Sequence, residues 1–153
     1  MVDAAEGCSA EHLLAELARV LPVLYEAALR LPYPVVETAE LPQTRLTHEQ
    51  WRKVFDRLRA VLGGDDLYWT VVPFGEDERA ELTASLADDL ADIYRDVKEG
   101  LDLAAAGASD NEVLWQWRFN FWAHWGRHAV EALRTIHARL AAGGGTRYDQ
   151  CDE

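Results

Sequence analysis

Apolar residues recur every three or four positions along most of the chain, which is the spacing of one face of an α-helix. The clearest run lies between residues 82 and 106, and its apolar positions are Leu82, Leu86, Leu90, Ile93, Val97, Leu101 and Ala104. Runs with similar spacing cover residues 13–31, 51–62 and 110–142. The pattern predicts an all-α fold, an antiparallel bundle of about four main helices.

Residues that commonly start or end a helix bound these runs. The start signals are Ser9 as an N-cap and two capping boxes, Thr47 with Gln50 and Ser109 with Glu112. The second helix is expected to end at Gly63 and Gly64, and the third at Gly107. Pro22 lies inside the first run, so it either kinks one helix or begins another.

Two segments lack the helical pattern. Residues 31–44 contain three prolines and are predicted to form an ordered loop. Residues 67–73, LYWTVVP, predict a short strand without an obvious hairpin partner, or a buried extended connection. Residues 9–142 are therefore predicted to form a single helical domain, with residues 1–8 and 143–153 as flexible ends.

The segment at residues 115–128, WQWRFNFWAHWGRH, allows two interpretations. Aromatic and polar residues alternate at its start as in a strand, whereas two histidines four positions apart at its end fit a helix. No glycine, proline or Asn-Gly turn separates Glu112 from Trp125, so one continuous helix is the simpler interpretation. On a regular helix the stripe that faces the bundle consists of Trp115, Trp122, Trp125, Ala129, Leu133, Ile136 and Leu140.

The aromatic residues of this helix extend beyond one face. They cover about 200° of its circumference, whereas a packed amphipathic helix shows an apolar stripe of roughly 100°. The helix is therefore predicted either to be central to the bundle or to be partly covered by a protein partner or a second copy of the chain. In the second case Trp117, Phe121 and Phe119 are predicted to form the interaction surface.

Composition and charge narrow the range of partners and compartments. The 153 residues carry a formal net charge of −12, from 27 acidic and 15 basic residues. This charge repels phosphate groups, so neither nucleic acid nor a membrane surface is an expected partner. The chain has no signal-peptide pattern and no apolar run that could cross a membrane. We expect a cytoplasmic protein in which Cys8 and Cys151 are unpaired, although a disulfide between the two ends is an alternative.

Acidic and histidine side chains on the last two predicted helices suggest a metal site. Asp89, Asp92 and Asp96 fall within about 60° of one another beside the apolar stripe of the third helix. Carboxylates in this arrangement can share a divalent cation, and histidines four apart, such as His124 and His128, can bind one metal ion. A short connection makes the two helices antiparallel neighbours, so the five residues are predicted to form one mixed site.

The same residues also have structural interpretations. The aspartates fit a solvated helix face or pairs with bases on a neighbouring helix, and the histidines fit hydrogen-bonded groups in an aromatic cluster. A polar network is predicted at Arg118 and Tyr94. Arg118 should meet an aspartate of the third helix or stack on an aromatic ring, and Tyr94 should be a core residue with a bonded hydroxyl.

Two short acidic motifs are similar to those of metal-dependent enzymes. DDLAD at residues 88–92 matches the aspartate-rich motif of terpene synthases, but the chain has no second motif and is short for that fold. ERAE and DLAD are weakly similar to the paired motifs of helical Mg²⁺-dependent nucleotide pyrophosphohydrolases, but they lie too close together. Neither similarity assigns an activity.

Four segments together resemble a bacterial family, domain of unknown function 5063. They are LPVLYEAALRLP (21–32), LYWTVVP (67–73), SLADDLADIYRDVKEGL (85–101) and FWAHWGRHAVEALRTIH (121–137). The resemblance covers roughly residues 13 to 140. It implies a soluble bacterial protein and carries no activity, cofactor or site residue with it.

The acidic surface and the wide aromatic face favour a protein-interaction or accessory module, such as an adaptor or a toxin-neutralising immunity protein. The alternative is a helical hydrolase that depends on a divalent metal ion held by the aspartates and histidines. No cofactor other than this ion is expected.

Overall fold

The computed structural model describes residues 9–35, 43–74 and 78–143. Their helices are α1 (Ala10–Leu29), α2 (His48–Leu62), α3 (Leu86–Ala105), α4 (Asp110–Asn120) and α5 (Gly126–Ala142), with a 3-10 turn at Gly63–Asp65 and a π-helical turn at Phe121–Trp125. The strands are β1 (Leu67–Phe74) and β2 (Glu78–Ser85). Helices dominate the fold, so the prediction of a helical bundle is confirmed.

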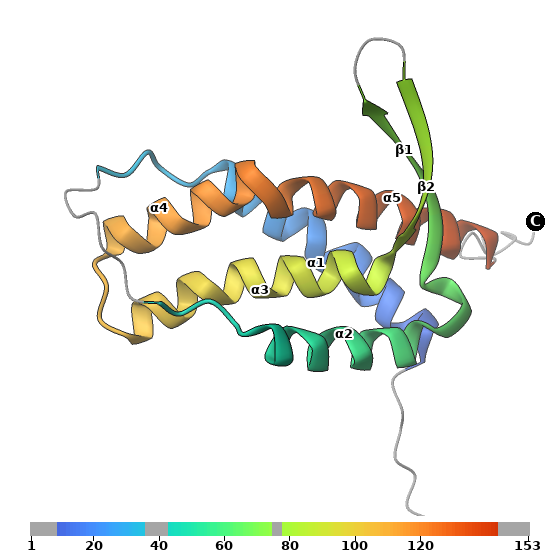
Figure 1. Cartoon of the computed structure of the whole chain (residues 1–153), viewed down its shortest axis with the longest axis horizontal. Coiled ribbons are helices and arrows are strands. Elements are labelled where there is room, and N and C mark those ends of the chain that lie inside the picture. The colour runs from blue at the N-terminus through green and yellow to red at the C-terminus, as the bar shows by residue number, and fades with distance from the viewer. Residues whose placement is uncertain (1–8, 36–42, 75–77, 144–153) are drawn as a thin grey trace, which may run out of the picture.

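Helix α3 occupies the middle of the bundle. It lies between α2 on one side and the α4–α5 segment on the other, and α1 passes behind them (Figure 1). The helix pairs that pack are α3 with α2, α4 and α5, and α1 with α5. The core between them contains Leu86 of α3 and Ile136 of α5, neither of which is exposed to solvent.

The predicted helix starts are present. Ser9 caps α1, and the capping boxes of Thr47 and Ser109 begin α2 and α4. Pro22 lies inside α1, which continues through it as a single helix. Gly63 follows α2, and Gly107 has a φ of 87°, a left-handed conformation that favours glycine, just after α3.

The hairpin is the main departure from the predicted fold. β1 pairs with β2 in antiparallel register, with Leu67 opposite Ser85, so the strand does have a partner. The prediction that α3 begins at Leu82 is wrong, because residues 82–85 belong to β2 and Ser85 caps a helix that begins at Leu86. Leu82 lies four positions before Leu86 and matched the helical period, but its backbone instead pairs with that of Thr70.

Residues 110–142 are helical throughout, as predicted, but the helix is not regular. At the π turn the N–H of Gly126 donates to the carbonyl of Phe121, five residues earlier. A π turn adds one residue to the helix and rotates the preceding part by about 100° relative to the part that follows. The buried residues of α4 are therefore Val113 and Asn120, and those of the turn are Phe121 and Trp125. The predicted Trp115 and Trp122 are 38% and 63% exposed.

Some predictions fall outside the described residues. These include the conformation of residues 1–8 and 144–153, the pairing of Cys8 with Cys151, and the middle of the proline-containing loop at residues 36–42. Residues 31–35, on the near side of that loop, are neither helix nor strand. Among the described helices, none combines the length and the apolar character needed to cross a membrane.

Candidate metal centre

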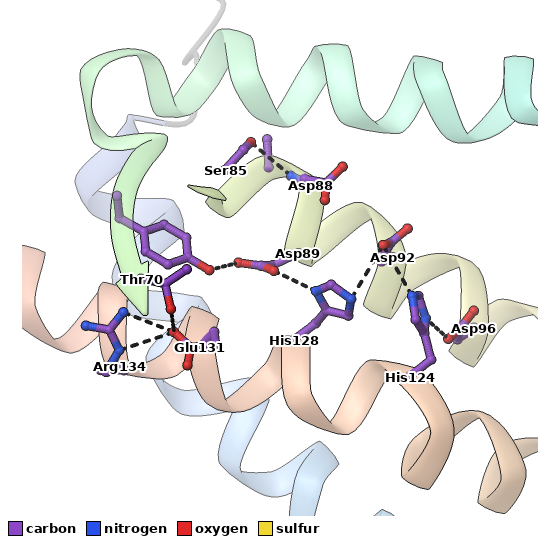
Figure 2. Close-up of polar contacts among 12 residues, drawn as sticks. Thr70, Ser85, Asp88, Asp89, Asp92, Asp96, His124, His128, Glu131 and Arg134 are labelled. Atoms are coloured by element: carbon purple, nitrogen blue, oxygen red, sulfur yellow. Dashed lines mark hydrogen bonds and ion pairs between the residues drawn. The ribbon is translucent and has the colours of Figure 1, made fainter. Parts of the chain in front are cut away.

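One face of α3 carries three aspartates that are almost completely buried. Asp89, Asp92 and Asp96 are 6%, 8% and 0% exposed. Their spacing of three and four residues places them on one side of the helix. This side faces His124 in the π turn and His128 in α5 (Figure 2). The structure thus brings together all five residues of the predicted site, which we call the Asp–His cluster.

An aspartate holds the Nδ1 atom of each histidine. Nδ1 of His124 lies 2.6 Å from Oδ2 of Asp96, and Nδ1 of His128 lies 2.6 Å from Oδ1 of Asp89. A carboxylate can only accept a hydrogen bond, so each Nδ1 carries a proton and donates it. In a neutral imidazole the Nε2 atom is then left with a free lone pair.

Both Nε2 atoms face the third aspartate, Asp92. They lie 3.6 Å (His124) and 3.7 Å (His128) from its Oδ2 atom. These separations exceed the roughly 2.7–3.2 Å of an N–H···O hydrogen bond. One ligand atom from each of the three residues lies within 4.8 Å of the other two. Within the described residues, Asp92, His124 and His128 therefore form a group that could hold a metal ion.

The second oxygen of Asp92 has partners of its own. The indole N–H of Trp51, from α2, donates to Oδ1 at 2.9 Å, and Nη2 of Arg95 lies 2.8 Å from the same oxygen. These two groups orient the carboxylate so that Oδ2 is the oxygen turned toward the histidines.

Asp89 connects the cluster to the hairpin. The hydroxyl of Tyr68, in β1, donates to Oδ2 of Asp89 at 2.5 Å. Burial, and then the hydrogen bond to Asp89, raises the pKa of Tyr68 well above its ordinary range. The bond to Asp89 also raises the pKa of His128, against an opposing effect of burial. Tyr68 therefore remains a neutral donor, and Asp89 orients His128.

At the other end of the cluster, two arginines lie close to the carboxylate of Asp96. Oδ1 of Asp96 lies 3.1 Å from Nη2 of Arg45 and 3.6 Å from Nε of Arg95, and Arg45 also pairs with Glu99 at 2.9 Å. Three cluster aspartates and Glu99 against two guanidinium groups leave a net charge of −2 when both imidazoles are neutral. Either a divalent cation or two imidazolium protons would balance this charge.

A pocket of about 740 Å³ opens beside His128. The inner face of the hairpin, with Tyr68, Thr70 and Leu82, forms one side, and Asp89 and His128 form part of the other. A small molecule in this pocket would therefore touch the edge of the cluster.

Arg118 and Tyr94, the residues of the predicted polar network, lie in different settings. Arg118 donates to the carbonyl of Leu31 at 2.9 Å and lies 3.6 Å from the ring centre of Tyr33. Its partner is thus the aromatic ring, one of the two expected options, and not an aspartate of α3. Tyr94 is 45% exposed and lies outside the core, so the prediction that it is a core residue is wrong.

The predicted interaction surface also changes. Phe121 is 2% exposed and is in the core, so its assignment to a surface is wrong. Trp117 is half-buried and donates its indole N–H to the carbonyl of Val97 at 2.8 Å, lying over Gly100. Phe119 is 53% exposed and stacks on Trp115. The π turn explains these changes, because it rotates α4 relative to the face expected from a regular helix.

Three residues that orient the cluster were not among those singled out from the sequence. Trp51 and Tyr68 come from elements far away in sequence, and Arg95 lies on α3 itself. Arg95 is three residues after Asp92, a spacing that predicts an ion pair on a helix. No local pattern marks Trp51 or Tyr68, since both also fit an apolar stripe.

The fold and the cluster together define an antiparallel helical bundle with a protruding hairpin and an interior aspartate–histidine centre. Residues 1–142 match the model of the family DUF5063, a domain of unknown function, and the chain belongs to this family. Its fold is similar to the crystal structure of protein BF1032 from Bacteroides fragilis, with a TM-score of 0.72, 24% sequence identity, and coverage of 95% of this chain and 82% of that one. No curated protein matches the chain.

Proposed function

We propose that the protein binds one divalent transition-metal ion through Oδ2 of Asp92 and the Nε2 atoms of His124 and His128. The observation that carries this proposal is the contrast between the two sides of each imidazole. On the Nδ1 side the contact is 2.6 Å, a hydrogen bond, and on the Nε2 side it is 3.6 or 3.7 Å. Two ligands about 2.1 Å from one metal ion at a tetrahedral angle lie about 3.4 Å apart, close to the longer separations.

The surrounding residues fit such an ion. Metal-bound histidines commonly donate their other N–H to a carboxylate, which fixes the ring and its tautomer. Asp96 and Asp89 occupy this position for His124 and His128. Trp51 similarly orients Asp92. The alternative, in which both imidazoles are doubly protonated, would favour shorter Nε2–Oδ2 contacts of about 2.7–2.9 Å.

The type of ligand atom favours some metals over others. Two imidazoles and one carboxylate suit Zn²⁺, Mn²⁺, Fe²⁺, Co²⁺ or Ni²⁺. Mg²⁺ and Ca²⁺ prefer oxygen ligands. We therefore expect the site to select a transition-metal ion.

We further propose that the metal-bound protein is a hydrolase. Three protein ligands are typical of a catalytic site, because they leave a coordination position for water or substrate. A bound divalent ion would supply an acidified water molecule at neutral pH. The chain's own residues hold the two imidazoles and Asp92 in place, and the neighbouring pocket provides space for a substrate beside His128.

A titration of metal-free protein tests this proposal. The protein is treated with a chelator and its thermal unfolding is followed with Zn²⁺, Mn²⁺, Co²⁺ or Mg²⁺. An ion at 100 times its Kd adds about 2.7 kcal/mol, which corresponds to roughly 5–10 °C for a domain of this size. We expect such a shift for a transition metal, with a stoichiometry of one.

The matched control uses two histidines of α5. His128→Ala should abolish the metal-dependent shift, whereas His137→Ala, on the exposed side of the same helix, should retain it. An equal shift in both variants, or no shift with any transition metal, would contradict the proposal.

A protein-interaction role is the second candidate, and an exposed aromatic patch favours it. Tyr33, Phe119 and Trp122 are 84%, 53% and 63% exposed and line the same shallow pocket with Trp115. Exposed apolar patches of this kind mark interaction sites. We propose a second copy of the chain as the first partner to test. Sedimentation should show a concentration-dependent dimer that Trp122→Ser abolishes, and a monomer at every concentration would contradict a homodimer.

A further inference from the structure

Two charged side chains of opposite sign, Asp88 and Arg127, line the pocket beside the Asp–His cluster. Within the part of the chain that the structure describes, neither the carboxylate of Asp88 nor the guanidinium of Arg127 makes a hydrogen bond or an ion pair with another side chain. Asp88 is half-buried, on α3, and Arg127 is exposed, on α5. The two charges therefore stand on opposite helices that border the pocket.

The other charged groups of the pocket are already engaged. Asp89 accepts from Tyr68 and His128, and Glu131 accepts from Thr70 and Arg134. A ligand would gain little from competing with these bonds. The two charges that remain to be matched are one negative and one positive.

Both free charges lie close to the proposed metal ligands. Asp88 precedes Asp92 by four residues, so the two side chains are neighbours on one face of α3. Arg127 directly precedes His128 in α5 and lines the same pocket. A molecule that spans the pocket would thus be held at two points beside the cluster.

The remaining lining is uncharged, and its apolar part comes from α2 and the hairpin. Phe55, Val71, Leu82 and Ala84 belong to this part. Pockets of about 300–1,000 Å³ hold small molecules, and one of about 740 Å³ is large enough for an amino-acid derivative or a dipeptide.

We propose that this pocket binds a small zwitterion, with its ammonium group at Asp88 and its anionic group at Arg127. The proposal rests on the proposed function, since it names the substrate class of the same site. The anionic group is a carboxylate or a phosphate, because a guanidinium binds both by the same paired hydrogen bonds. An amine bearing either group is the shared chemistry.

Binding of a matched peptide series to the metal-bound protein tests this inference. The probes are glycylglycine, N-acetylglycylglycine without the ammonium group, and glycylglycinamide without the carboxylate. A hydrogen bond to a charged group is worth roughly tenfold or more in affinity. We expect glycylglycine to bind at least about tenfold more tightly than either blocked peptide. Phosphoethanolamine is the fourth probe, and its affinity relative to glycylglycine assigns the anionic group.

Two variants assign the contacts. Asp88→Asn should remove the preference for glycylglycine over the N-acetyl peptide, and Arg127→Gln should remove the preference over the amide. Each variant should keep the other preference and should still bind the metal ion, which shows that it is folded. Lys53→Gln, which changes an exposed cation on α2, is the control and should alter neither preference.

The results separate this inference from the proposed function. Metal binding with equal affinity for the three peptides, or with no zwitterion bound, would overturn the zwitterion site and leave the metal site standing. Failure to bind a transition metal would overturn the proposed function itself.

Discussion

The acidic residues of this protein occur in two settings, and the difference shows where its chemistry resides. On the outer surface, Glu26 with Arg30 and Glu49 with Lys53 form pairs four residues apart whose side chains are each at least 60% exposed. Such exposed pairs contribute about 0.3–0.5 kcal/mol each. On the inner face of α3, the aspartates contact groups from α2, β1, the π turn and α5.

The comparison shows that location, and not the local spacing of charges, separates the two groups. The spacing of the inner aspartates along α3 resembles that of any acidic helix surface. Burying a charged carboxylate costs free energy unless hydrogen-bond donors or a cation compensate its charge. We interpret the inner group as a metal centre and the outer pairs as solubilising surface.

The difference between the inner and the outer carboxylates is tested most strongly by replacing one of each. Asp92→Asn removes a proposed ligand and should weaken metal binding by about 100-fold or more, because the loss of a ligand exceeds the 10–100-fold effect of an outer contact. Glu49→Gln, the surface control, should leave the affinity unchanged. Titration calorimetry measures both, and similar affinities for the two variants would contradict our interpretation.

A smaller effect is expected for a residue that orients a ligand. In Asp89→Asn the amide oxygen can still accept from Nδ1 of His128, but the charge is lost and an NH2 group replaces the oxygen that accepts from Tyr68. We expect the metal affinity to fall by about 10–100-fold, as for other contacts behind a metal-bound histidine. Competition with a chromophoric chelator gives the affinity, and Asp102→Asn, which changes a carboxylate paired with Lys98 near the C-terminal end of α3, is the control. An unchanged affinity would show that Asp89 has only a structural role.

A substitution in the π turn should have the next largest effect, a loss of stability. A Cβ at Gly126 would lie 2.6 Å from the carbonyl oxygen of Phe121, a contact that the turn cannot accommodate without rearrangement. Gly126→Ala should destabilise the protein by about 1–3 kcal/mol, the usual effect of an overpacked site. Gly143→Ala, where the nearest atom is at 3.4 Å, is the control in urea denaturation. Equal stability of the two variants would argue against a π turn at this position.

The smallest effect concerns the pH dependence of the metal-free protein. Burial, and then the charges of Asp92 and Asp89, raises the pKa of Asp88, while His128 and Arg95 act against this shift. A carboxyl whose pKa is raised in the folded state binds its proton more tightly there, so stability falls as the pH rises from about 4 through the folded pKa.

Asp88→Asn should therefore be more stable than the wild-type protein at neutral pH, and the difference should disappear in acid. Unfolding with urea at several pH values measures it. A variant that is less stable than the wild type at neutral pH would reverse the expected sign and indicate that the Asp88 carboxylate stabilises the fold.

Most of the fold could be predicted from the sequence, because its signals are local. The helical period, the N-cap at Ser9 and the capping box at Thr47 each depend on residues within one or two turns. The second strand could not be predicted, because Leu82 fits the helical period of the residues that follow it. Its strand conformation depends on pairing with β1, and the residues of β2 alone do not indicate this pairing. The π turn could not be predicted either, because a regular helical wheel does not represent it. Trp122, which the wheel places on the buried stripe, is therefore exposed.

The candidate site was predictable to a similar extent. The five residues of the Asp–His cluster follow from helical spacing and from the short connection between neighbouring helices. The sequence did not show which atoms converge, namely both Nε2 atoms on one oxygen of Asp92, because this depends on the rotation of the π turn. It also did not show that Trp51 and Tyr68 hold the carboxylates, because they come from α2 and β1.

Location of a bound ion tests the central claim most directly. Crystals of the protein grown with Zn²⁺ and measured at the zinc absorption edge would show the ion by its anomalous signal. We predict one strong peak about 2.0–2.2 Å from Oδ2 of Asp92 and from Nε2 of both His124 and His128. A peak only at surface carboxylates, or no peak between α3 and α5 when zinc is in excess, would contradict the metal centre.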